Sequence, residues 1–228
     1  MTNIENYKEH HKIFEQNVAF AARNIHYLLH ISDRAKEDEA VFKALNKNAR
    51  FWNDYNFNVI QTVIVFLGKI FDEDSRTYNI SRTLNLAKRN LNFFSKQSLR
   101  DRKIASAGEF EGLDEYVDGA HELSSEDIKT IKKAAKEARR LWENFKPLRD
   151  KFYAHSEILS QEDKEQLLQQ AKYDDLRQII QILLNITHAF EQAELNGRKP
   201  DLTQDYEGTI RYAQGEADRL IDTLIAGK

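Results

Sequence analysis

Arg149, Asp150 and His155 form the cluster of this sequence whose residue types and spacing fit chemistry on a phosphate group. Arginine keeps its charge at all relevant pH values, and its planar guanidinium matches two phosphate oxygens at once. Histidine titrates near neutral pH and is the most frequent general acid or base. One short segment, residues 149–155, therefore carries a candidate anion clamp and a candidate proton-transfer group.

Arg149 falls on the apolar stripe of a helix that we predict from about residue 124 to residue 155. A buried guanidinium cannot lose its proton and needs an anionic or hydrogen-bonding partner. Two interpretations stay open: a structural ion pair with an acid such as Asp72 or Asp150, or a phosphate clamp. The stripe advances in steps of three and four residues, as one face of a helix does, through Ile128, Ile131, Ala135, Ala138, Trp142, Phe145, Arg149 and Phe152.

Arg149 and His155 do not meet on one ideal helix. Six positions separate them in the sequence, which corresponds to roughly 120° around a helix. Pro147 also interrupts the hydrogen bonds of the preceding turn. The two side chains can converge only at a helix end, or with residues of another helix or another subunit. His155 can alternatively serve only as a favourable charge at the helix C-terminus.

The side of this helix opposite the stripe is basic. It is either an ordinary solvated face or the wall of an RNA path, because phosphate neutralisation drives such binding. We expect Trp142, Phe145 and Phe152 to be core or dimer contacts, not platforms for base stacking. The basic residues are Lys129, Lys132, Lys133, Lys136, Arg139 and Arg140.

The other histidines lack the surroundings of a metal site. His10 and His11 are neighbours, and His26 and His30 share a helix face, but no zinc signature surrounds either pair. We expect these histidines at solvated or partly buried helix positions. We expect His188 at the surface.

The elements that must position the cluster are predicted to be helices throughout. The chain of 228 residues holds only 8 Gly and 2 Pro, which favours few and long elements. The segment 51–71 is apolar almost all round and suits a helix in the middle of a bundle, although 63–65 could be a strand. We expect one all-α domain over 1–228, with 106–123 as a loop or short-helix insertion. Helices are predicted at about 4–31, 37–71, 80–90, 91–105, 124–155, 173–193 and 206–225, with another start signal at Ser160.

Composition excludes several classes of protein. The absence of Cys rules out disulfides and Cys-based zinc sites. A formal net charge of −3 gives no overall attraction to nucleic acid, so any such site must be a local patch. The N-terminus is polar and no apolar stretch is long enough for a membrane span. We therefore expect a cytoplasmic protein that needs no metal and no cofactor.

The string Arg149-Asp150-x-x-x-x-His155 resembles the R-x(4–6)-H motif of HEPN domains (higher eukaryotes and prokaryotes nucleotide-binding). The segment 149–156 looks like the abortive-infection, AbiU-type branch. The preceding apolar helix that ends in Asp72 is also similar to that branch. This resemblance implies an up-and-down helical bundle with additional helices.

The resemblance also implies a function. Many HEPN domains are metal-independent endoribonucleases that act on single-stranded RNA in phage defence or as toxins, with a composite site across a homodimer. His155 would then be the acid or base at the 2′-hydroxyl or the leaving 5′-oxygen, Arg149 would hold the phosphate, and Asp150 would support Arg149. The products would end in 2′,3′-cyclic phosphate. Residues expected to contact RNA are Lys151, Tyr153, Arg139 and Arg140.

A second hypothesis is a catalytically silent helical module that binds protein or nucleotide, with Arg149 in a structural ion pair. The sequence names neither an RNA target nor a neutralising partner protein.

Overall fold

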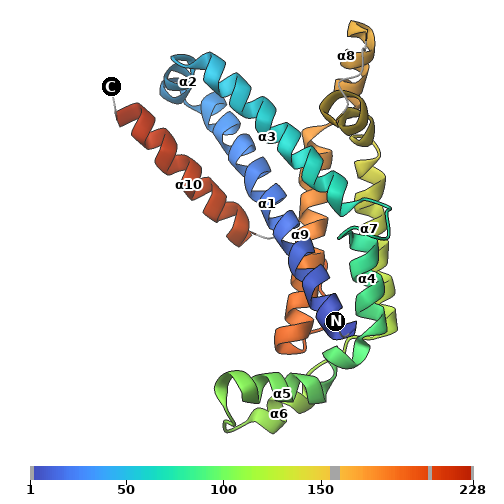
Figure 1. The fold of residues 1–228 in the computed structure, drawn as a ribbon. Coiled ribbons are helices and arrows are strands. Elements are labelled where there is room, and N and C mark those ends of the chain that lie inside the picture. Colours follow the sequence, from blue (N-terminus) through green and yellow to red (C-terminus); the bar gives the residue numbers. More distant parts are fainter. Residues whose placement is uncertain (1–2, 155–159, 205–206, 227–228) are drawn as a thin grey trace.

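The computed structural model of the protein describes residues 3–154, 160–204 and 207–226, with side chains throughout except at 152–154, 161, 164, 168 and 207–209. Every regular element in these ranges is a helix, which confirms the predicted all-α bundle (Figure 1). The β-branched residues 63–65 lie inside a helix. Across the same ranges, no helix is long and apolar enough to cross a membrane.

The helices follow one another with short connections. The α-helices are α1 Asn3–Glu37, α2 Glu39–Asn46, α3 Ala49–Ile70, α4 Ile80–Arg89, α5 Lys96–Ala107, α6 Leu113–Asp118, α7 Ser125–Trp142, α8 Gln161–Gln170, α9 Tyr173–Asn196 and α10 Glu207–Ala226. A 3-10 turn, η1, covers Leu91–Phe94, and a π-helical segment, η2, covers Leu148–Ala154.

Two of the predicted helices are each divided in the structure. The segment 37–71 forms α2 and α3, which are separated by a turn at Lys47 and Asn48; the Asp38 carboxylate accepts a hydrogen bond from the Ala40 amide and so sets the start of α2. The segment 91–105 forms η1 and α5, because the Ser95 hydroxyl accepts from the Ser98 amide in the same way. Side-chain caps of this kind compete with a continuous helix.

Other start and stop signals are confirmed. Ser124 and Asp127 form a reciprocal capping box at the start of α7, and Ser160 caps α8. Gly197 ends α9 with a positive φ of 57°, a conformation that costs glycine little. In the segment 106–123 the chain forms the short helix α6.

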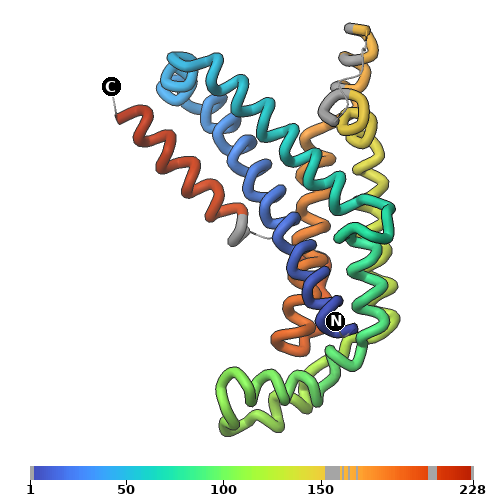
Figure 2. Tube along the Cα trace, in the orientation of Figure 1, coloured from blue at the N-terminus to red at the C-terminus, as the bar shows by residue number. Residues whose placement is uncertain are grey.

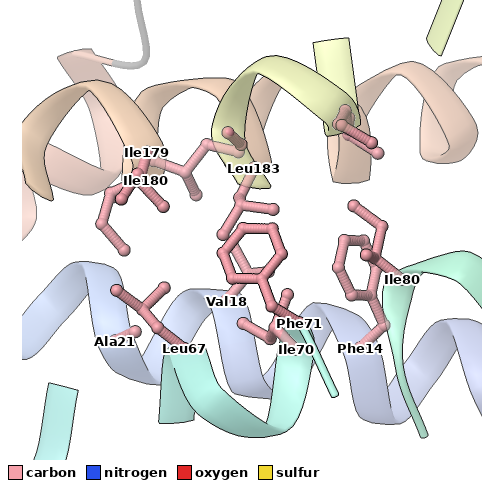
Figure 3. Packing of buried hydrophobic residues seen from close by; sticks show 14 of the residues in the cluster. Phe14, Val18, Ala21, Leu67, Ile70, Phe71, Ile80, Ile179, Ile180 and Leu183 are labelled. Carbon is pink, nitrogen blue, oxygen red and sulfur yellow. The ribbon is translucent and has the colours of Figure 1, made fainter. Parts of the chain in front are cut away.

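The main core lies where α1 crosses α3, α4 and α9. Phe14, Val18 and Ala21 of α1 face Leu67 and Ile70 of α3 and, from the other side, a row on α9 (Figure 3). Each such aliphatic or aromatic side chain contributes about 1.5–3 kcal/mol when fully buried. The row on α9 is Ile179, Ile180 and Leu183.

A second, smaller cluster holds α10. This helix runs beside α1, on the side away from α7 (Figures 1 and 2). Its Ala217 and Ile221 pack against Ile31 of α1 and Val41 of α2. The ends of α1 and α2 therefore have a core of their own.

The prediction that 51–71 is buried all round is wrong. Phe51 is 61% exposed and Phe57 is 47% exposed. Helix α3 packs on α1, α2 and η2, which cover only part of its circumference. Apolar content alone did not reveal which face would lack a neighbour.

The expected placement of His10 and His11 is also wrong, because both are buried. The His11 ring stacks on Tyr7 and meets Phe190 of α9 edge-on. Burial without a charged partner lowers the pKa of His11 to about 4. His26, His30 and His188 are partly buried.

Candidate functional site

The segment that carries Arg149 follows a break in the predicted motif helix. Helix α7 ends at Trp142, a turn covers Glu143 to Phe145, and the chain then winds into η2. The prediction of one helix to His155 is therefore wrong. Pro147 has no amide hydrogen and its ring crowds the preceding turn, which disfavours a continuous α-helix through this position. Wide π-helical turns occur frequently at functional sites.

The apolar stripe of α7 anchors this segment in the core. All six of its members from Ile128 to Phe145 are buried, as predicted. Trp142 stacks between the rings of Phe71 and Phe145 at centroid distances of 5.8 and 6.4 Å. Trp142 and Phe145 are thus core residues. The side chain of Phe152 lies outside the described part of the chain.

The Arg149 side chain lies against the backbone of α3 at Gly68. A β-carbon at Gly68 would stand 2.6 Å from Cδ of Arg149 and 3.0 Å from its Nη1. The absence of a side chain at this position therefore leaves the space that the guanidinium stem occupies. The Arg149 amide is held at 3.0 Å by the Phe145 carbonyl. Backbone and side chain are both fixed by residues of the core region.

Arg149 is paired with its neighbour Asp150. Its Nε donates to Oδ1 of Asp150 at 2.7 Å, and Nη2 lies 2.6 Å from the same oxygen. Asp150, and not Asp72, is thus its partner among the two acids considered. The side chains of Arg149 and Asp150 are 32% and 36% exposed, so the pair lies at the surface of the core and not inside it. An incoming phosphate can reach this guanidinium.

A cavity of about 170 Å³ lies beside Arg149. Arg139 lines it and donates to Glu73 at 2.6 Å. Lys146 lines it too, and no described residue forms an ion pair with Lys146. Phe71, Asp72, Glu73, Trp142 and Glu143 complete the lining. The cavity therefore combines two aromatic rings with three cationic and three acidic side chains, and Arg149 and Lys146 are the cations in it that can contact a phosphate.

The remaining predicted residues differ in their placement. His155 lies outside the described residues. Tyr153 belongs to η2 by its backbone, and its side chain is likewise outside the described part. Lys151 is exposed. Arg139 reaches the cavity, whereas Arg140 pairs with Glu137 at 2.7 Å and does not line it.

The sequence did not predict the contact of Gly68 with Arg149 or the position of Lys146 in the cavity. A signal for Gly68 existed, because a glycine inside a helix costs about 0.5–1 kcal/mol relative to alanine and often marks a close approach. Lys146 gave no such signal, since a lysine beside a proline is ordinary on a surface.

Comparison with protein families gives one match over most of the chain. The sequence profile of the family HEPN_AbiU2, described as AbiU2, matches residues 4–211. No protein with curated function and no solved structure matches the chain. The match spans both α3 with Gly68 and η2 with Arg149 and Asp150, so that the whole candidate site lies within it. The chain therefore belongs to the HEPN AbiU2 family, whose context is abortive infection.

Proposed function

We propose that the protein is a metal-independent endoribonuclease that cuts single-stranded RNA in an abortive-infection response. The observation that carries the proposal is the position of Arg149 against Gly68, where its partly exposed guanidinium lies beside a cavity that Arg139 and Lys146 also line. A guanidinium that served only in a structural ion pair would not have to be accessible to a ligand. The family match supports the abortive-infection context.

In the proposed reaction, His155 removes the proton of a ribose 2′-hydroxyl. The 2′-oxygen attacks the adjacent phosphorus, the bond from phosphorus to the 5′-oxygen breaks, and that oxygen takes a proton from a histidine acting as acid. The products are a 2′,3′-cyclic phosphate and a 5′-hydroxyl. Negative charge grows on the phosphate oxygens in the transition state, and a fixed Arg149 stabilises it. Asp150 keeps Arg149 oriented until the phosphate arrives.

The proposed active unit is a homodimer. Arg149 and His155 are six positions apart in the sequence, a spacing that predicts that the two side chains do not meet on one regular helix. Two copies of the motif that face each other across a two-fold axis would supply two arginines and two histidines to one site. Closed two-fold dimers are also the commonest symmetric assembly.

The test is cleavage of a labelled single-stranded RNA by purified protein in excess EDTA. We expect cleavage with cyclic phosphate ends, and we expect its loss in His155→Ala and in Arg149→Ala. Lys129→Ala, which alters an exposed lysine paired with Glu126, is the matched control and should cleave normally. Cleavage that persists in both motif variants refutes the proposal.

The second candidate function is a silent binding module, and the Arg149–Asp150 pair is the observation that favours it. In that case the unaltered protein leaves RNA intact under every condition, while protein or nucleotide ligands still bind.

A further inference from the structure

Three neighbouring hollows of the surface share lining residues. One lies between α4 and α7, one lies over the segment before α4, and the third is the cavity at Arg149, with volumes of about 220, 420 and 170 Å³. Arg139 lines the first and the third, Glu73 the second and the third, and Ser81 and Asn85 the first and the second. We name these three adjoining hollows together the α4–α7 groove.

The groove exists because small and apolar side chains form its floor. Helices α4 and α7 run side by side (Figure 1). Ile80, Leu84 and Ala135 are buried between them. The short side chain of Ala135 leaves a depression, and Lys132, Lys136 and Arg139 project from α7 along its edge at helical spacing.

The charge of the groove is opposite to that of the chain. Seven Lys or Arg side chains line the three hollows against three carboxylates, whereas the whole chain has a net charge of −3. The excess of cations is local, so it is a property of this surface and not of the composition. A concentrated positive strip attracts a polyanion and raises its rate of association.

Several of these cations are available to a ligand. Among the described residues, neither Lys136 nor Lys146 takes part in an ion pair. Lys132 donates only to the neutral amide oxygen of Asn85, at 2.9 Å. Arg139 and Arg149 are exceptions, since they pair with Glu73 and Asp150. Most of the positive charge in the groove therefore stays uncompensated by protein groups.

We infer that the α4–α7 groove binds the phosphate backbone of a single RNA strand and leads it to Arg149. The inference rests on the proposed function for the identity of the polyanion. Packed helices lie about 8–10 Å apart, so a hollow between two of them accommodates one strand and not a duplex. Ser81 and Asn85 of α4 line the same hollow as the lysines of α7 and add uncharged hydrogen-bonding groups. The groove thus selects for a flexible polyphosphate chain.

The experiment measures binding without cleavage. In the full chain carrying His155→Ala, the anisotropy of a fluorescein-labelled oligouridylate gives Kd as a function of salt. The groove variant is Lys132→Gln with Lys136→Gln. The matched control is Lys129→Gln with Lys133→Gln, which removes equal charge from the same helix outside the groove. A duplex RNA of equal length and inorganic phosphate are the comparison ligands.

We expect the groove variant to weaken binding of the single strand at least about tenfold, and the salt slope to fall by roughly 0.7 for each lost phosphate contact. The control should change Kd less than about twofold. Equal losses in both variants, or no loss in the groove variant, overturn the inference. The inference is also overturned if the duplex or free phosphate binds as tightly as the single strand. Should the double variant melt early, the single change Lys136→Gln, at an exposed and unpaired residue, replaces it with the same criterion.

This outcome is separable from that of the proposed function. A chain that binds RNA through the groove but never cuts it refutes the nuclease and keeps the groove. A chain that cuts RNA normally with both lysines replaced refutes the groove and keeps the nuclease.

Discussion

Arg149 lies across α3 at Gly68, and a β-carbon at position 68 would stand 2.6 Å from its Cδ. Helix α3 and η2, which are far apart in the sequence, are thus in contact at Gly68, which has no side chain, and Arg149, which has a long one. The guanidinium is held by this contact and by Asp150. A fixed position matters for a guanidinium that stabilises a transition state, because displacement of such a group by about 1 Å can lower the rate about 10²-fold.

Gly68→Ala should therefore separate activity from stability. Alanine is favoured over glycine inside a helix by about 0.5–1 kcal/mol, and the three atoms nearest to the added methyl group all belong to the Arg149 side chain, which must shift because its Cδ would be 2.6 Å away. We expect the fold to be as stable as the unaltered protein or more so, while RNA cleavage falls at least about tenfold. Thermal melts beside a cleavage assay measure both quantities.

Gly215→Ala is the matched control for this change. Gly215 lies within α10, and a β-carbon there would meet no atom within 4 Å. Its replacement should raise stability similarly and leave cleavage unchanged. Full activity of Gly68→Ala would show that Arg149 needs no fixed position.

Local chemistry explains which parts of this arrangement the sequence predicted. The buried stripe from Ile128 to Phe145 and the caps at Ser124 and Ser160 depend on neighbours within four residues, which the sequence shows directly. The motif pair Arg149 and Asp150 was equally visible as a string, but the sequence left the partner of Arg149 open between Asp72 and Asp150, and the structure pairs it with Asp150.

Long-range packing explains what the sequence did not predict. Whether Phe51 is covered depends on which helices reach α3, and the proximity of Gly68 to Arg149 depends on how α3 crosses η2. Neither follows from a local pattern. The end of α7 at Trp142 is an intermediate case: Pro147 predicted a disturbance, but the sequence left open whether the helix would kink or restart there.

Arg149→Ala and Asp150→Asn should leave stability almost unchanged. Both side chains are about one third exposed, and ion pairs this open to solvent contribute about 0–1 kcal/mol. A loss of several kcal/mol would instead indicate an interior pair. Urea unfolding measures the difference, and Arg140→Ala, which breaks the more exposed pair with Glu137, provides the reference value. We expect Arg149→Ala to abolish cleavage and Asp150→Asn to reduce it.

Cleavage per chain should fall on dilution. If each site needs motifs from two chains, the rate per chain follows the fraction of dimer, which decreases as the concentration drops below the dissociation constant. Initial rates over a dilution series, compared with mass measured by light scattering at the same concentrations, test this expectation. A constant rate per chain where scattering shows only monomer would mean that one chain holds a complete site.

Stability should fall as the pH drops from about 6.5 to about 4, and His11 should account for much of the change. Burial lowers the pKa of His11 from 6.5 to about 4. Above pH 6.5 the ring is neutral in both the folded and the unfolded chain. Between these values only the unfolded chain binds the proton, so unfolding becomes easier by up to about 3 kcal/mol. Burial also lowers the pKa of His10 and of His26, which act in the same direction.

The carboxyl groups of Glu15 and Glu194 oppose this trend at the acid end. Burial raises the pKa of each, so the folded chain takes up their protons before the unfolded chain does, and this uptake favours the folded state as the pH falls. His11→Phe keeps an aromatic ring against Tyr7 and Phe190 but cannot titrate. Its unfolding free energy, measured with urea near neutral pH and near pH 5, should vary less with pH than that of the unaltered protein. An identical pH dependence in both proteins would mean that His11 becomes protonated without unfolding.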